Sequence, residues 1–234
     1  MLKTAWDWTK SLGVALILAL MIKTSVVEAY KIPSSSMEET LLVGDFLLAN
    51  KFIYGMRLPI PFVDIKLPAL ADPKPGDIII FKYPKDPSQN YIKRCVAVEG
   101  QKLRIIDKQL FIDGKPVPLP EHAKFEDYRL IPGRDNGTWG RNFRDNMATI
   151  EVPEGMLFMM GDNRDNSSDS RFWGFLDRKL VLGEAMIIHW SWAPDDNAPR
   201  ISSTDPLSYI KSIAYNIYHL PDRVRWGRLA SIIR

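Results

Sequence analysis

The chain has 234 residues, of which 46% are hydrophobic and 25% are charged, and its formal net charge is +3. So mild a charge argues against a nucleic-acid-binding protein, and the apolar content excludes a disordered chain. The single cysteine, Cys95, excludes an intrachain disulfide, and no Cys/His cluster has the spacing of a zinc site. We therefore expect no nucleic-acid partner, no metal and no cofactor.

The first predicted element is an uninterrupted apolar run at residues 12–22. Its length is typical of the hydrophobic region of a signal peptide, and the small residues around Ala29 would suit a cleavage site. Extended to Tyr30, the same run is long enough to cross a bilayer if Lys23 snorkels towards the headgroups. A buried core helix is a third interpretation. Hydropathy alone does not separate the signal peptide from the anchor.

From Tyr30 onwards, short β-type runs dominate, bounded by clusters of Pro, Gly, Asn and Asp. Helical periodicity is scarce before residue 205, so the sequence predicts a mainly β fold. The polar stretch 114–150 is typical of an insertion between core strands. The predicted strands are residues 41–49, 76–81, 91–98, 102–113, 155–161 and 183–192.

The segment 32–41 (IPSSSMEETL) holds the first candidate catalytic residues. In an extended chain Ser34 and Ser36 point the same way, so one hydroxyl could attack a carbonyl while the other donates to the oxyanion. The alternative is structural, because Ser36 followed by Glu39 forms the capping box of a helix start. Taken alone, the segment favours the capping box.

The strand 91–98 (YIKRCVAV) holds the second candidate, Lys93. Alternation places Lys93 on one face with Tyr91, Cys95 and Ala97, where it is the only charge. Burial lowers the pKa of an amine, which is how a lysine becomes a base near neutral pH. The alternative is a solvent-facing lysine on an edge strand, and this segment alone favours the edge strand slightly.

The loop 161–174 (GDNRDNSSDSRFWG) is dense in Asp, Asn, Ser and Arg. A calcium loop of the EF-hand type fails, because Arg164 and Ser170 occupy positions that need a ligand and a glycine. A rigid loop held by Asp–Arg pairs and presenting hydroxyls to a site is the better interpretation. A solvated surface loop is the remaining alternative.

The C-terminal stretch 205–234 begins with Asp205-Pro206, a helix start, followed by apolar residues at helical spacing. Beyond Pro221, arginines alternate with Trp226 and aliphatic residues, a pattern typical of the bilayer interface. We predict that 205–234 is a basic amphipathic membrane-associating tail. Packing on the β domain is the alternative, and for residues 207–217 it is equally favoured.

The segments 33–37 (PSSSM), 76–81 (GDIIIF), 91–94 (YIKR) and 161–174, in this order, resemble the motifs of the bacterial type I signal peptidase (leader peptidase) family. The resemblance spans nearly the whole chain. One departure adjoins the serine motif, where Glu39 stands in place of the usual proline. What the resemblance implies is a membrane-bound serine endopeptidase that removes signal peptides from secretory preproteins after small residues, as in Ala-x-Ala.

The resemblance also implies residue roles, with Ser36 as nucleophile and Lys93 as general base. Ser34 would help to form the oxyanion hole, and Ser167 would orient the lysine. The residues that would brace the site as ion pairs are Asp169, Arg171, Asp162 and Arg94.

The resemblance implies a domain layout as well, and it favours an uncleaved anchor. Residues 1–11 would be a short cytoplasmic N-terminus and 12–30 one transmembrane helix. Residues 31–204 would form a catalytic domain of antiparallel β-sheet on the periplasmic side of the bacterial inner membrane, with an inserted β-rich subdomain at about 99–155. The expected partners are secretory preproteins and the phospholipid bilayer.

Three rival functions share some of these features. A Ser–Lys autoprotease of the repressor-cleaving type should carry an N-terminal DNA-binding module, where this chain has an apolar segment. A Ser-His-Asp hydrolase lacks support, because no serine lies in a G-x-S-x-G elbow and His189 is expected to be a core histidine. A membrane-tethered peptide-binding protein without catalysis is disfavoured by the presence of both Ser36 and Lys93.

Overall fold

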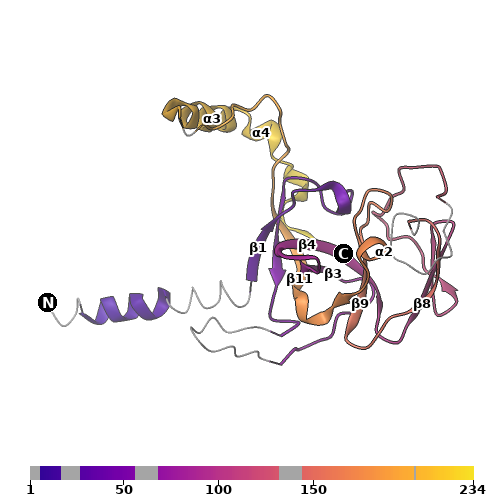
Figure 1. Ribbon diagram of the computed structural model, residues 1–234. Helices are drawn as coiled ribbons and strands as arrows, with labels where there is room; N and C mark the ends of the chain where they lie inside the picture. Colours follow the sequence, from indigo (N-terminus) through magenta and orange to yellow (C-terminus); the bar gives the residue numbers. More distant parts are fainter. Residues whose placement is uncertain (1–5, 17–26, 56–67, 132–143, 203) are drawn as a thin grey trace.

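The computed structural model describes residues 6–16, 27–55, 68–131, 144–202 and 204–234, and every structural statement concerns these ranges. Antiparallel strands in two sheets form the body of the described chain, so the predicted mainly β fold is confirmed (Figure 1). The larger sheet runs in the order β1-β2-β11-β3-β4-β9-β10, with β12 paired to β11. Its strands are β1 (Val27–Lys31), β2 (Asp45–Asn50), β3 (Ile78–Tyr83), β4 (Asp86–Val98), β9 (Met156–Met160), β10 (Leu176–Asp177), β11 (Val181–Ser191) and β12 (Ser231–Ile232).

A second, four-stranded sheet runs in the order β7-β6-β5-β8. It consists of β5 (Lys102–Ile106), β6 (Gln109–Ile112), β7 (Lys115–Pro116) and β8 (Met147–Glu151). These strands lie in the chain between β4 and β9, which are neighbours in the larger sheet. The sheet projects to one side of the molecule, around β8 (Figure 1).

Strand β3, in the middle of the larger sheet, is buried on both faces over Ile78–Phe81. In β3, Ile78 and Ile80 belong to one hydrophobic cluster, whereas Ile79 and Phe81 belong to another. The continuous apolar run in β3 follows from this, because neither face meets water. A third cluster joins the two sheets through Val96, Ala97, Leu103, Ile105, Phe158 and Met160.

Strand β4 has a bulge opposite β9, between Cys95 and Ala97. The predicted alternation over residues 91–98 therefore holds only up to Cys95. Cys95 packs in one cluster, while Val96 and Ala97 both pack in the cluster between the sheets. The bulge inserts one residue and so reverses the faces that follow it.

The predicted anchor at residues 12–30 is wrong at its C-terminal end. Residues 27–30 belong to β1, which pairs with β2 and lies in the sheet. Residues 6–16 are helical and exposed, and 17–26 lie outside the described residues. Among the helices that the structure describes, none has the length and hydropathy needed to span a bilayer.

The predicted tail at residues 205–234 divides into two parts. The helix α3 (Pro206–Tyr218) begins as expected, with Leu207 N–H donating to the Asp205 carboxylate, and extends away from the sheets (Figure 1). Past α4 (Leu220–Arg223), the chain returns to the body through η4 (Trp226–Arg228) and β12. This last part packs on the β domain through β12, which is the alternative interpretation, while Trp226 and Ile232 stay exposed. Its contact with a bilayer stays a prediction.

Candidate active site

The nucleophile turn is the short 3-10 helix η1 (Ser35–Met37), which follows an extended Ser34. Met37 is fully buried in the cluster that includes Leu41 and Leu47, and it fixes the turn against the sheet. Ser36 is half-buried, and its carbonyl oxygen accepts a hydrogen bond of 3.1 Å from Asn163 N–H. The alternative of Ser36 as a helix cap is wrong, because the cap of η1 is Ser34 and its hydroxyl caps nothing.

Lys93 projects from β4 towards this turn. Strand β4 lies between β3 and β9, so the alternative of an edge-strand lysine is wrong, and only 3% of Lys93 is exposed. Its Nζ lies 2.6 Å from Ser36 Oγ and 2.9 Å from the carbonyl oxygen of Ile92. The ring of Tyr91 lies on the same side, 5.4 Å from Nζ to its centroid.

The surroundings of Lys93 favour its neutral form. Burial lowers its pKa to about 8, against the smaller opposing effects of the Asp169 and Asp162 carboxylates. The amine is therefore neutral in a substantial fraction of molecules slightly above neutral pH. A neutral amine in hydrogen-bond contact with a serine hydroxyl can accept the hydroxyl proton.

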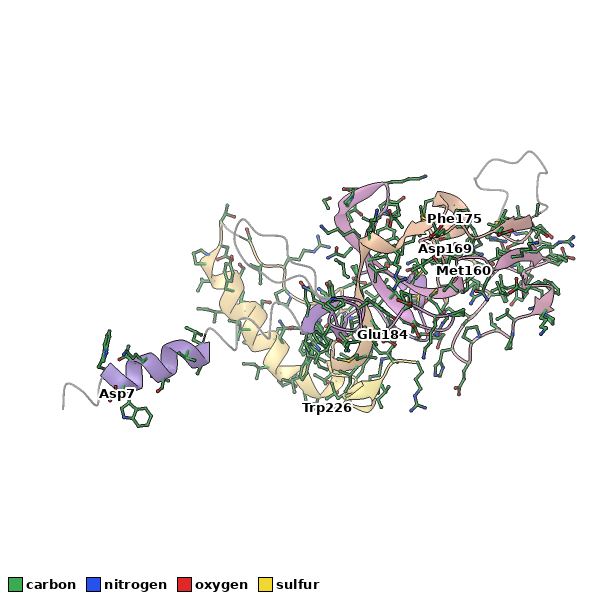
Figure 2. The ribbon with its side chains drawn as sticks, turned by 90° about the horizontal axis from the view of Figure 1, so that it is seen from below. Asp7, Met160, Asp169, Phe175, Glu184 and Trp226 are labelled. Carbon is green, nitrogen blue, oxygen red and sulfur yellow. The ribbon has the colours of Figure 1, made fainter. Side chains whose placement is uncertain are left out.

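The loop 161–174, which follows β9, supports the nucleophile turn through buried ion pairs and hydrogen bonds. Asp169 is fully buried and accepts hydrogen bonds from Arg171 Nε (2.9 Å), Arg171 Nη2 (2.8 Å) and Gly161 N–H (3.0 Å). Burial would raise the pKa of Asp169, but the Arg171 guanidinium outweighs it and the net shift is downward. Asp169 lies inside the body beside Met160, far from Asp7 on the N-terminal helix (Figure 2). The solvated-loop alternative is wrong, because these charged groups are buried.

A second buried ion pair connects the loop to β4 and to the nucleophile turn. Arg94 donates to both carboxylate oxygens of Asp162, at 2.8 and 2.7 Å. Thr40, four residues after Ser36, donates to the same carboxylate at 2.7 Å. One carboxylate thus connects the strand that carries Lys93 to the turn that carries Ser36.

The family described as Signal peptidase, peptidase S26 matches residues 5–190, most of the chain. The chain belongs to this family. It is a serine peptidase, and hence a hydrolase.

Individual relatives agree with this assignment. A signal peptidase I of Pseudomonas fluorescens is 35% identical, over 88% of this chain and 79% of the relative. That of Aquifex aeolicus is 31% identical, over 89% of this chain and 93% of the relative. A solved signal peptidase I from Enterococcus faecalis V583 is 28% identical and covers 49% of this chain and 97% of its own, with a TM-score of 0.36.

Two serines, to which the signal peptidase resemblance assigns supporting roles, lie near the dyad without hydrogen bonds of good geometry from their hydroxyl groups. Ser34 Oγ is 3.5 Å from Ser36 Oγ, longer than a good hydroxyl hydrogen bond. Ser167 is buried and faces Asp169, but its hydroxyl closes no hydrogen bond of good geometry among the described residues. The roles of Ser34 in the oxyanion hole and of Ser167 in orienting the lysine stay predictions.

Gly161 is a site residue that sequence reasoning did not single out. A Cβ at this position would lie 2.5 Å from the Ser36 carbonyl oxygen and 2.2 Å from Ser167 Oγ. Only glycine lets the loop approach the nucleophile turn so closely. The sequence did contain a signal for this role, because Gly161 is the first residue of the 161–174 motif.

His189 differs from its predicted environment. It is exposed on β11, with an edge contact to Phe46 at 6.3 Å between ring centroids, and is not a core histidine. Across the described ranges, no group of three or more His, Cys, Asp or Glu residues converges as a metal site would.

Proposed function

We propose that this chain is a membrane-bound endopeptidase that removes signal peptides from secreted preproteins, with Ser36 as nucleophile and Lys93 as general base. The single observation that carries the proposal is the 2.6 Å contact between Lys93 Nζ and Ser36 Oγ. The lowered pKa of Lys93 supports it, since a general base must be neutral before it can accept a proton.

The proposed reaction uses the dyad twice. Lys93 takes the Ser36 proton while Oγ attacks the scissile carbonyl carbon, and the resulting ammonium returns the proton to the leaving amine. Water then hydrolyses the acyl-serine ester, with Lys93 again as base. The oxyanion is stabilised by the Ser34 hydroxyl and the Ser36 backbone N–H. Asp162, Arg94, Asp169 and Arg171 hold the loop and strand in place and take no part in proton transfer.

The proposed substrate is an extended segment with small residues at the first and third positions before the cut, as in Ala-x-Ala. An extended peptide presents alternate side chains to the same side, so two pockets are enough to select those positions. The relatives named signal peptidase I support this substrate class.

The proposed location is the bacterial inner membrane, with the catalytic domain on the periplasmic side. The apolar N-terminal run, from residue 12 to a point before β1, would be the anchor, with residues 1–11 in the cytoplasm. The exposed face of α3 would be a second contact with the phospholipid bilayer. The catalytic domain would span residues 31–204, with the 99–155 subdomain carrying the second sheet.

The test is cleavage of a secretory precursor by detergent-solubilised full-length protein. We expect Ser36→Ala and Lys93→Met each to lower the rate at least a thousandfold, about the loss seen when a member of a catalytic unit is removed. The double variant should be no slower than either one, because the two residues act together. His189→Ala is the control and should cleave at the wild-type rate.

Two results would count against this function. Normal cleavage by folded Lys93→Met protein excludes the lysine mechanism, and loss of cleavage in folded His189→Ala protein supports a histidine triad. Precursors with a bulky residue at the first or third position should be cut far more slowly. Equal rates for small and bulky residues would argue against the proposed pockets.

A further inference from the structure

Lys124 lies in the connection between β7 and β8, within the inserted region, and contacts the active-site loop through its backbone. Its N–H donates to the Asp162 carbonyl oxygen and its own carbonyl oxygen accepts from Arg164 N–H, both at 2.9 Å. The residue between those two, Asn163, is the one that donates to the Ser36 carbonyl oxygen. The backbone of Lys124 is therefore fixed beside residues 162–164, which in turn contact the nucleophile turn.

The Lys124 side chain extends to the residues that follow the nucleophile. Its Nζ lies 3.1 Å from the Glu38 carboxylate and 3.5 Å from that of Glu39, and Glu126 lies 2.9 Å away on its own segment. Hydrogen bonds to Glu126 and Glu38 raise the pKa of Lys124, so it stays charged. One cation thus connects the two glutamates of the nucleophile turn to the segment that carries Glu126.

The backbone at Glu39 explains why this connection matters. Glu39 has a φ of 75°, in the left-handed region that a residue other than glycine seldom adopts. Such a conformation persists only where the surroundings hold it. A proline, confined to a φ of about −65°, could not occupy this turn as it stands.

We propose that Lys124 is a positioning residue for Ser36, which holds the turn in its left-handed form through Glu38 and Glu39. The role rests on the proposed function of the dyad. Without the cation, the strained backbone at Glu39 shifts within this turn and carries Ser36, three residues earlier, out of line with Lys93. Loss of contact between Ser36 and Lys93 lowers the rate of the chemical step, whereas substrate binding in the pockets is unchanged.

The test compares Lys124→Met with wild type in the precursor assay, using full-length protein. We expect kcat to fall about tenfold, because small displacements of reacting groups are costly, with KM within about twofold. Lys124→Arg should restore most of the rate. Lys102→Met, at an exposed lysine of β5 in the same region, is the matched control and should leave kcat unchanged. Melting temperatures should change little, because partly exposed ion pairs contribute little to stability.

A double-mutant cycle tests whether Lys124 acts through the two glutamates. The Glu38→Gln, Glu39→Gln variant should be slowed to a similar extent, and adding Lys124→Met to it should cause no further loss. Additive losses overturn the proposed route, as does an unchanged kcat in Lys124→Met. A wild-type protein that leaves the precursor uncut overturns the proposed function and this role with it. An active wild type with an equally active Lys124→Met overturns the positioning role alone.

Discussion

At the scale of single residues, the decisive feature is the burial of one amine. Lys93 is almost fully enclosed, and its Nζ has the Ser36 hydroxyl and the Ile92 carbonyl oxygen as hydrogen-bond partners. Neither partner carries a full charge, so nothing nearby compensates fully for the lost hydration of an ammonium ion. The lowered pKa of Lys93 follows from this, and it sets the pH range in which the dyad can work.

Activity should rise with pH as Lys93 loses its proton. With a pKa of about 8, the neutral fraction grows about tenfold for each unit of pH below that value. We expect kcat to rise tenfold per pH unit between 6 and 7 and to level off above about 9. The measurement is a pH–rate profile with one precursor, and a profile that is flat from pH 6 to 9 contradicts this assignment.

The lowered pKa of Lys93 also makes the stability of the fold depend on pH. The folded pKa of about 8 lies below the reference value of 10.5, so between them the folded state binds fewer protons than the unfolded state. Unfolding free energy therefore rises with pH through this window, in total by on the order of 3 kcal/mol. Chemical denaturation at pH 7 and pH 10 should show this gain in wild type and lack it in Lys93→Met.

At the scale of elements, the C-terminal segment packs against the larger sheet next to the nucleophile turn. Arg228 donates to the fully buried Asp45 carboxylate at 2.6 Å and to the Thr40 carbonyl oxygen at 2.9 Å. Arg225 contacts Asp45 and the Val43 carbonyl oxygen. These two arginines are held by the protein itself, so we do not expect them to supply the main contact with lipid headgroups.

Arg228→Ala should lower the unfolding free energy by about 1–3 kcal/mol. The variant leaves a buried carboxylate with fewer partners, and an under-satisfied buried group costs about this much. Denaturant titration of the variant beside Arg200→Ala, at an exposed arginine, is the measurement. Equal stability of the two variants would show that Asp45 does not depend on Arg228.

At the scale of the whole molecule, α3 presents its apolar side outwards. Leu207, Ile210 and Ile217 are each at least 60% exposed, whereas Ser208 and Ser212 are buried. The polar side is held to the body through Tyr215, which donates to Asp195. An apolar stripe on an outward helix suits the interface of a bilayer, where it can insert to the depth of the headgroups.

We expect a protein lacking residues 1–25, which keeps β1, still to bind anionic vesicles. Ile210→Glu with Ile213→Glu should reduce vesicle binding about tenfold or more, since burying charge in the apolar layer is costly. Leu130→Glu, at an exposed leucine outside α3, is the control. Salt should weaken binding only slightly, because Arg225 and Arg228 are engaged with Asp45. Unchanged binding in the double variant excludes α3 as the contact.

The sequence by itself determined the family and the approximate positions of β2 to β6, β9 and β11 along the chain. Short β-type runs bounded by turn residues located these strands, and the motifs around Ser36, Lys93 and residues 161–174 were specific enough to indicate the dyad. Such signals are local, because side-chain alternation and turn residues are properties of neighbours in the chain. The start of α3 at Asp205-Pro206 was predictable for the same reason.

Only the tertiary structure decided whether these residues meet. The 2.6 Å contact between Ser36 and Lys93 joins residues 57 positions apart and depends on the pairing of β3 with β4 and the packing of Met37. The bulge after Cys95, the left-handed Glu39 and the pairing of Arg228 with Asp45 arise from long-range packing. No local pattern encodes them, because their free energy comes from groups that the chain brings together only when it folds.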